Sequence, residues 1–159
     1  MFCSFRHLVR LSGFHVPTPG FVGVRPIDES LFKDPPFPII TPEDKQFAKD
    51  INEQLKAYLP LWERLDRLMV LDPVDYHLSK QWRKEAEHKM IALGKMGMSD
   101  EEIDQFVDYF WRSLHPELFI TPLVKNPNLV DLVIEINRDH SYGNIYKRKQ
   151  KEQNSSLRL

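Results

Sequence analysis

The chain has 159 residues, enough for one domain, and its 22 Lys and Arg against 23 Asp and Glu leave a formal net charge of −1. That balance gives no electrostatic reason to expect a nucleic-acid partner. The single cysteine, Cys3, excludes an internal disulfide framework and a cysteine-rich zinc site. The longest apolar runs, 68–71 and 132–134, are too short to cross a bilayer, so we expect no membrane partner.

Residues 1–20 contain basic residues and serines but no acid; the first acidic residue is Asp28. This composition is compatible with an organelle transit peptide, which would place the protein in a plastid. The alternative, which we favour, is a stretch unrelated to the rest of the chain in a cytoplasmic protein. At the other end, the polar stretch 147–159 is typical of a flexible tail. The expected folded domain is therefore 21–146.

Residues 29–42 are punctuated by prolines and predict a loop. Thr41 then suits the N-cap of a helix with Pro42 at its first position. The apolar residues that follow at helical spacing, and that we expect to face the core, are Phe47, Ile51, Leu55 and either Tyr58 or Leu59. Pro60 predicts a kink or an end to this helix.

The apolar run 68–71 predicts a buried parallel strand. Asp72 and Pro73 repeat the pattern of a cap followed by proline, and they predict that the next helix begins there. Its apolar stripe, which we expect to face inward, consists of Val74, Leu78, Trp82, Ala86, Met90 and Leu93. Gly94 is suited to end this helix in the left-handed conformation.

Ser99 and Glu102 have the spacing of a capping box and predict the start of the most clearly amphipathic helix in the chain. Its apolar face comprises Ile103, Phe106, Val107, Phe110, Trp111 and Leu114. Pro116 and Pro122 predict that the next stretch is broken up. The last predicted strand is 131–137.

This order of strand, helix, helix and strand predicts an α/β fold with a parallel sheet flanked by helices. Only two full strands are found, together with a remnant at 21–24. Because parallel sheets usually have several strands and are covered on both faces, part of the sheet is expected to be missing.

Three stretches carry a resemblance to a known family: YLPLWERLD (58–66), DPVDYHLSKQWRKEAE (72–87) and GMSDEE (97–102). Together they resemble the C-terminal half of the plant and cyanobacterial type of D-glycerate 3-kinase, a branch of the P-loop kinases. The resemblance extends from about 21 to 146. It implies a P-loop kinase-like sheet, and transfer of a phosphoryl group from ATP, with Mg²⁺, to D-glycerate to give 3-phosphoglycerate.

The resemblance places Trp82, Arg83 and Lys84 on a lid helix whose basic residues reach over the nucleotide phosphates. It implies that Arg83 stabilises charge on the transferred phosphoryl group, and that Arg83, Lys84 and Lys80 contact ATP. The alternative for Arg83 is an ordinary surface pair with Glu87 at i+4.

Other candidate residues lie in loops. Ligands of α/β sheets bind outside the carboxyl ends of strands, so Asn137 and the ring of Tyr142 could border the adenine of ATP. The alternative is a surface turn at 137–143 in which Gly143 has positive φ. Arg25, after the remnant strand, could touch substrate. The six histidines show neither an HExxH motif nor paired spacing with cysteine, so no metal site is expected on this chain.

No Gly-x-x-x-x-Gly-Lys-Ser/Thr motif occurs in the 159 residues. The N-terminal strands and the P-loop of the family are therefore expected to be absent, and neither activity nor tight binding of ATP and Mg²⁺ is expected of this chain alone. A truncated, frameshifted or split gene would give such a chain, with the missing N-terminal half as its partner. The alternative is a non-catalytic remnant that acts as an interaction or regulatory module.

Overall fold

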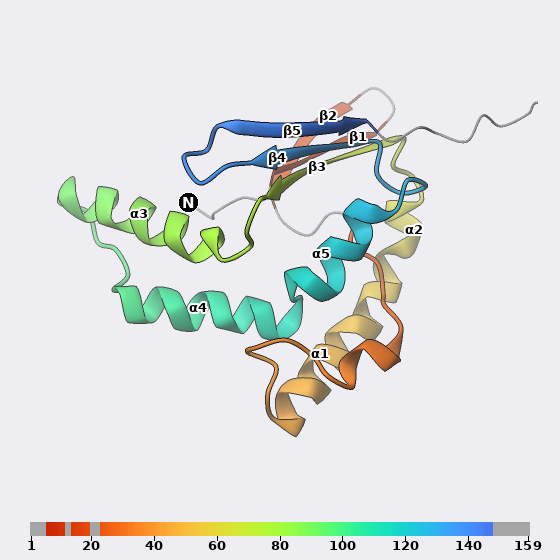
Figure 1. Cartoon of the computed structure of the whole chain (residues 1–159), viewed down its shortest axis with the longest axis horizontal. Helices are drawn as coiled ribbons and strands as arrows, with labels where there is room; N and C mark the ends of the chain where they lie inside the picture. The colour runs from red at the N-terminus through yellow and green to blue at the C-terminus, as the bar shows by residue number, and fades with distance from the viewer. Residues whose placement is uncertain (1–5, 12–13, 20–22, 148–159) are drawn as a thin grey trace, which may run out of the picture.

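The computed structural model describes residues 6–11, 14–19 and 23–147, with side chains from residue 23 onward. Its strands are β1 (Arg6–Leu11), β2 (Phe14–Pro19), β3 (Arg67–Pro73), β4 (Leu132–Ile136) and β5 (Tyr142–Lys147). Its helices are α1 (Pro42–Gln54), α2 (Leu59–Trp62), α3 (Leu78–Ala92), α4 (Asp100–Ser113) and α5 (Pro116–Lys125), with 3₁₀ turns η1 (Glu29–Phe32) and η2 (Leu55–Tyr58). Figure 1 shows the helices together below the sheet.

The strands form one sheet in the order β2-β1-β3-β4-β5. The α/β class is confirmed, and so is the parallel pairing of the two predicted strands, in which Val70 of β3 lies opposite Val133 of β4. The other pairs are antiparallel, so the sheet is mixed. The sequence pattern predicts neither β5 nor the hairpin of β1 and β2, which falls within the unmatched stretch 1–20.

The remnant strand expected at 21–24 is not found in residues 23 and 24, which are the part of this range that the structure describes. Residues 21 and 22 lie outside the described residues, while Gly23 occupies a turn at φ +81° and Val24 is buried in irregular structure. A β-carbon at position 23 would lie 2.8 Å from Leu68 Cδ2, so glycine allows both the positive φ and the close approach to β3.

The main core lies between one face of the sheet and the helices. Leu68 and Val70 of β3 and Val133 of β4 point to this face and are almost fully buried. They belong to one cluster with side chains from α1, α5 and the loop before α1. Asp131 fastens the start of the parallel pair, because its carboxylate accepts a 2.9 Å hydrogen bond from the Leu68 amide. This clamp fixes the register from which both strands run toward their carboxyl ends.

The predicted start of α1 is confirmed. Thr41 and Asp44 form a capping box, in which each side chain accepts the backbone N–H of the other, and Pro42 opens the helix. Of the predicted inward residues, Leu55 is buried, Phe47 and Ile51 are only half-buried, and the buried positions of α1 itself are Ala48 and Asn52. The Asn52 amide explains the shift: it accepts from the Ile27 N–H at 2.8 Å and donates to the Ile27 carbonyl at 3.0 Å. A polar clamp thus takes an inward position that the hydrophobic pattern cannot reveal.

The predicted start of α3 is wrong. Strand β3 continues through Pro73, and the helix begins only at Leu78, after a turn in which Asp75 accepts the N–H of His77 at 2.9 Å. Pairing with β4 extends to Pro73, which lies opposite Ile136. The inter-strand contacts therefore override the capping signal of the sequence.

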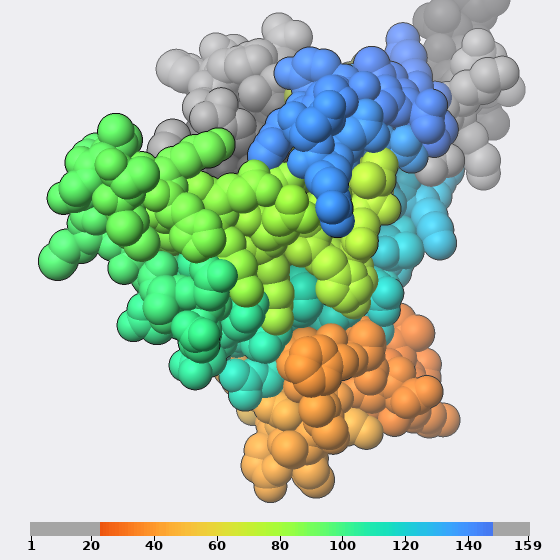
Figure 2. Space-filling view, turned by 60° about the vertical axis from the view of Figure 1, so that its left-hand side comes forward, coloured from red at the N-terminus to blue at the C-terminus, as the bar shows by residue number. Residues whose placement is uncertain are grey.

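The predicted inward stripe of α3 is also wrong. Of its members, Leu78 is buried, but Ala86 is exposed and Leu93 is 74% exposed. The end of α3 projects from the body of the molecule (Figure 2), so its apolar residues have little to pack against. The predicted left-handed end at Gly94 is confirmed by its φ of +72°.

The predictions for α4 hold and those for the following stretch do not. The capping box of Ser99 and Glu102 is present, and Ile103, Val107 and Trp111 form the buried face of α4. The residues after it form α5 despite its two prolines. Pro116 occupies the first turn, where no N–H is needed, and the other proline is tolerated because the helix buries most of its apolar side chains in the core. Among the described residues, no helix is long and apolar enough to cross a membrane.

Candidate functional site

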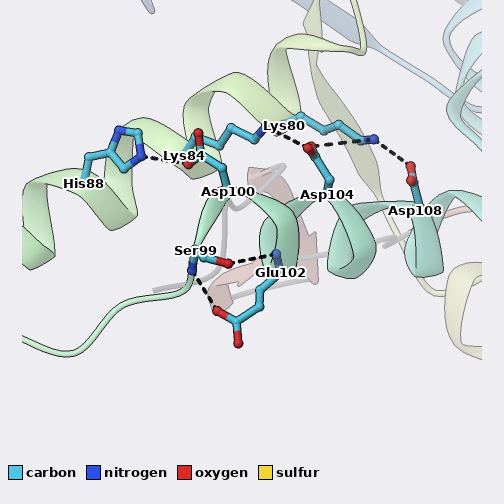
Figure 3. A network of polar contacts seen from close by, with 8 residues as sticks. All are labelled: Lys80, Lys84, His88, Ser99, Asp100, Glu102, Asp104 and Asp108. Carbon is cyan, nitrogen blue, oxygen red and sulfur yellow. Dashed lines mark hydrogen bonds and ion pairs between the residues drawn. The ribbon is translucent and has the colours of Figure 1, made fainter.

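The cations predicted to contact ATP line the interface between α3 and α4, which run antiparallel (Figure 1). Figure 3 shows how basic residues at every fourth position of α3 meet acidic residues at every fourth position of α4. Lys80 Nζ lies 2.7 Å from Asp108 and 3.8 Å from Asp104, which is shared with Lys84 Nζ at 2.8 Å. His88 Nε2 lies 2.8 Å from Asp100. We call this set of pairs the charge ladder.

The ladder follows from local structure at the start of α4. Ser99 accepts the Glu102 N–H at 3.2 Å, and Glu102 accepts the Ser99 N–H at 2.7 Å (Figure 3). This fixes the first turn of α4, and the acids that follow at intervals of four residues then share one face of the helix. The hydrogen bond with Asp104 raises the pKa of Lys84, so this lysine is held in its charged form.

Arg83 lies on the buried side of α3. Its guanidinium pairs with Glu87 one turn later, and the side chains of the two residues are only 12% and 6% exposed. Glu87 also accepts the backbone N–H of Met98 at 3.2 Å, and the Arg83 guanidinium carbon lies 5.7 Å from the centre of the Phe106 ring. The i+4 pairing weighed from the sequence is thus present, but inside a helix interface rather than on a wetted surface.

The loop from β3 to α3 carries an aromatic cluster that joins this interface to the core. The Tyr76 ring lies 5.0 Å from Trp111 and 5.1 Å from His115, both edge-on. His115 is fully buried; its Nδ1 accepts the Glu117 N–H at 3.2 Å, so Nε2 donates to the Phe37 carbonyl at 3.0 Å. Burial lowers the pKa of His115 and favours this neutral ring.

The turn between β4 and β5 contacts α3. The Trp82 indole N–H donates to the Arg138 carbonyl at 2.9 Å, and its ring centre lies 4.5 Å from that of His140. The Asn137 amide, a candidate for the adenine, donates to Ser141 Oγ at 3.1 Å and so helps to close the turn. Tyr142 is 74% exposed.

A glycine prediction in this turn is wrong. His140, not Gly143, has the positive φ, of 65°. Gly143 serves a close approach instead, because a β-carbon there would lie 3.1 Å from Glu135 Cβ. Arg25 is half-buried, and its Nε has no hydrogen-bond partner among the described residues.

Two carboxylates that the sequence did not mark as candidate site residues lie side by side at the carboxyl ends of β3 and β4. Asp72 is opposite Glu135 in the parallel register. Burial, with repulsion from Glu135, raises the pKa of Asp72. Hydrogen bonds from Tyr146 and Asn144 lower the pKa of Glu135. The signal that could have located the pair was two acids at the ends of neighbouring parallel strands. Within the part of the chain described, no group of three or more His, Cys, Asp or Glu side chains could hold a metal ion.

Comparison with known proteins points to one kind of enzyme. No protein-family model matches the chain. Over 115 residues it is 30% identical to the chloroplastic D-glycerate 3-kinase of Arabidopsis thaliana, covering 69% of this chain and 25% of the relative. Over 90 residues it is 27% identical to the uncharacterized kinase mug58 of Schizosaccharomyces pombe, covering 55% of this chain and 32% of the relative.

The solved structure of D-glycerate 3-kinase from Cryptococcus neoformans var. grubii matches with a TM-score of 0.67 at 20% identity, over 86% of this chain and 53% of that chain. The chain thus has the α/β fold of part of a kinase. It is homologous to the D-glycerate 3-kinases, and its partial coverage fits their C-terminal half. It spans about a quarter to a third of the length of the curated relatives it matches.

Proposed function

We propose that this chain is the C-terminal part of an ATP-dependent D-glycerate 3-kinase, which phosphorylates D-glycerate to 3-phosphoglycerate. The observation that carries the proposal is the 30% identity with the Arabidopsis D-glycerate 3-kinase over 115 residues. The kinase reaction needs cations around the transferred phosphoryl group. The candidates on this chain are Arg83, Lys84 and Lys80.

The charge ladder sets a condition on that role. Lys80 and Lys84 are paired with acids of α4, so either lysine would have to exchange a carboxylate for a phosphate to contact ATP. Carboxylate and phosphate oxygens make similar charge-assisted hydrogen bonds with an ammonium group, so the exchange is chemically matched. The same exchange is unfavourable for Arg83, because it would leave the buried carboxylate of Glu87 unpaired. We therefore assign Lys80 and Lys84 to phosphate binding ahead of Arg83, whose main task is to hold α3 on α4.

ATP and Mg²⁺ would depend largely on residues outside this chain. The P-loop motif that holds the β- and γ-phosphates does not occur in the 159 residues. The acids of the described residues do not gather into a metal site. When bound, Mg²⁺ would neutralise charge on the transferred phosphoryl group. To ATP binding, this chain would contribute the basic side chains of α3 and the Asn137 amide in the turn after β4.

A second candidate is a non-catalytic remnant that serves as an interaction or regulatory module. One observation favours it: Lys80, Arg83 and Lys84, the basic residues proposed to contact phosphate, are each paired with an acid, as expected of helices packed for a structural role alone. The two candidates differ in the nucleotide sequence upstream of Met1. A strand followed by Gly-x-x-x-x-Gly-Lys-Ser/Thr in any reading frame there supports the kinase.

The direct test is a coupled assay with ATP, Mg²⁺ and D-glycerate. We expect only background turnover from the isolated chain, because positioning of the phosphates accounts for most of the catalysis in such enzymes. Turnover by the isolated chain that Lys84→Ala reduces would contradict the need for a second half. A matched control is Lys89→Ala, which removes an exposed lysine of the same helix outside the ladder.

A further inference from the structure

The sheet carries a second apolar face, opposite the one that packs on the helices. Its members alternate along the strands with the buried Leu68, Val70 and Val133. By the register of the strands they lie next to one another across β3, β4 and β5, and we call them the outer sheet face: Met69, Leu71, Leu132, Ile134 and Ile145.

This face lacks a covering layer among the described residues. None of its members belongs to either core cluster or packs against one as a partly buried side chain. Ile145 is 61% exposed, and the other four are half-buried. The strand β5 that carries Ile145 lies at the surface in Figure 2, and the helices gather on the other side of the sheet in Figure 1.

The composition of the outer sheet face argues that it is covered in the working protein. A sheet with one wetted face shows apolar residues inward and polar residues outward along each strand. Here Val70 and Val133 point inward, yet their neighbours Leu71 and Ile134 on the other face are apolar too. Strands that are apolar on both faces are the pattern of a sheet buried on both sides. Contiguous exposed apolar patches on soluble proteins usually mark interaction surfaces.

The comparison with the solved kinase supplies an occupant. This chain covers 53% of the Cryptococcus D-glycerate 3-kinase, so nearly half of that fold has no counterpart here. A fold that contains this sheet therefore has polypeptide left over to cover it. We infer that the outer sheet face is the docking surface for the remaining half of the kinase fold, supplied by a polypeptide segment that presents apolar side chains to it. This inference rests on the proposed function and names the surface through which the two parts meet.

The test is co-expression of the full chain, carrying an affinity tag, with the N-terminal part of the Arabidopsis D-glycerate 3-kinase that precedes the similar segment. We expect the two to purify as a 1:1 complex. Ile145→Lys places a charge on the outer sheet face at a position exposed enough to be tolerated, and it should weaken the complex by at least about tenfold. Ile134→Thr, which keeps a β-branched side chain in the strand, should weaken it less. The matched control is Leu93→Lys, an equally apolar-to-charged change at the exposed end of α3, which should leave binding unchanged.

Three results would overturn the inference. One is the absence of a complex with the unchanged chain. Another is a complex that Ile145→Lys and Leu93→Lys affect equally. The third is a chain that is already a dimer by light scattering and becomes a monomer with Ile145→Lys, because the face would then be occupied by a second copy. A complex that forms through this face but does not phosphorylate D-glycerate would leave the docking surface standing and remove the proposed function.

Discussion

The guanidinium of Arg83 and the carboxylate of Glu87 form an ion pair whose two side chains are only 12% and 6% exposed, between helices α3 and α4. A buried ion pair stabilises the fold little more than apolar residues of similar size would. Removing one partner, however, is costly, because the other charge stays buried and unpaired. Glu87 is also held by the Met98 N–H. The pair thus connects α3 to the segment that leads into α4. Removing it is therefore expected to lower stability, whether or not Arg83 has a role in catalysis.

We predict that Arg83→Ala lowers the free energy of unfolding by about 3–5 kcal/mol, because Glu87 is left buried and unpaired. Chemical denaturation of the isolated chain measures this. The double change Arg83→Met with Glu87→Met should recover part of the loss, since no charge is stranded. A loss below about 1 kcal/mol for Arg83→Ala would instead mark the pair as an ordinary surface pair.

The charge ladder predicts that removing one of its acids increases the affinity of α3 for phosphate. Asp104 is shared by Lys80 and Lys84, so Asp104→Asn should free both lysines in part. We expect the affinity for inorganic tripolyphosphate, measured by calorimetry, to rise by about 3- to 10-fold. Glu101→Gln is the matched control, since it removes the same charge from an exposed position of α4 outside the ladder. If both variants gained the same affinity for tripolyphosphate, the change in net charge alone would explain the gain. That result would count against phosphate binding by α3.

Two of the three tryptophans, Trp62 and Trp82, differ in whether the indole N–H has a hydrogen-bond acceptor. Trp82 donates its indole N–H to the Arg138 carbonyl, whereas Trp62 Nε1 is buried with no hydrogen-bond partner among the described residues. Trp82→Phe should cost about 1 kcal/mol and speed hydrogen exchange in the turn 137–141. Trp62→Phe should be neutral or stabilising by the same reasoning. Similar losses in both variants would mean that ring packing, rather than the hydrogen bond, holds α3 to the turn.

His115 predicts how stability depends on pH. Its pKa is lowered by burial, so the unfolded chain takes up a proton before the folded one does. The contribution of His115 is therefore fully present above its unfolded pKa of about 6.5, and it is lost as pH falls toward the folded pKa. The slope from one such group cannot exceed about 1.4 kcal/mol per pH unit.

His115→Gln keeps one donor and one acceptor in the cavity but cannot be protonated, so the slope below pH 6.5 should flatten relative to the unchanged chain. Parallel slopes for the unchanged chain and His115→Gln would contradict the assignment.

The sequence predicts well wherever a local signal is strong. The capping box of Ser99, the apolar face of α4 and the left-handed Gly94 are set by neighbours within one helical turn, and all are confirmed. The α/β class follows from two apolar strands with helices between them. The parallel pairing of β3 with β4 was predicted from the same pattern and is confirmed.

The failures have a common physical cause in tertiary contacts. Asp72 and Pro73 look like a helix start, yet pairing with β4 keeps them in a strand. The sequence predicts that the apolar stripe of α3 faces inward, but Leu93 is 74% exposed, and the buried side of the helix carries the ion pair of Arg83. Pro122 was expected to break the chain, but burial of α5 outweighs its missing N–H. Which acids meet Lys80 and Lys84 depends on the antiparallel packing of two helices, which no spacing along one helix can give.

The most direct measurement of the central claim is the activity of a fusion in which the N-terminal part of the Arabidopsis D-glycerate 3-kinase is joined to this chain. We expect ATP- and Mg²⁺-dependent phosphorylation of D-glycerate by the fusion and only background from either part alone. In the fusion, Lys84→Ala should lower the turnover number more than it raises the Michaelis constant for D-glycerate, because the lost contact is to the reacting phosphates. A fusion that folds cooperatively and binds ATP but does not phosphorylate D-glycerate would contradict the proposed function.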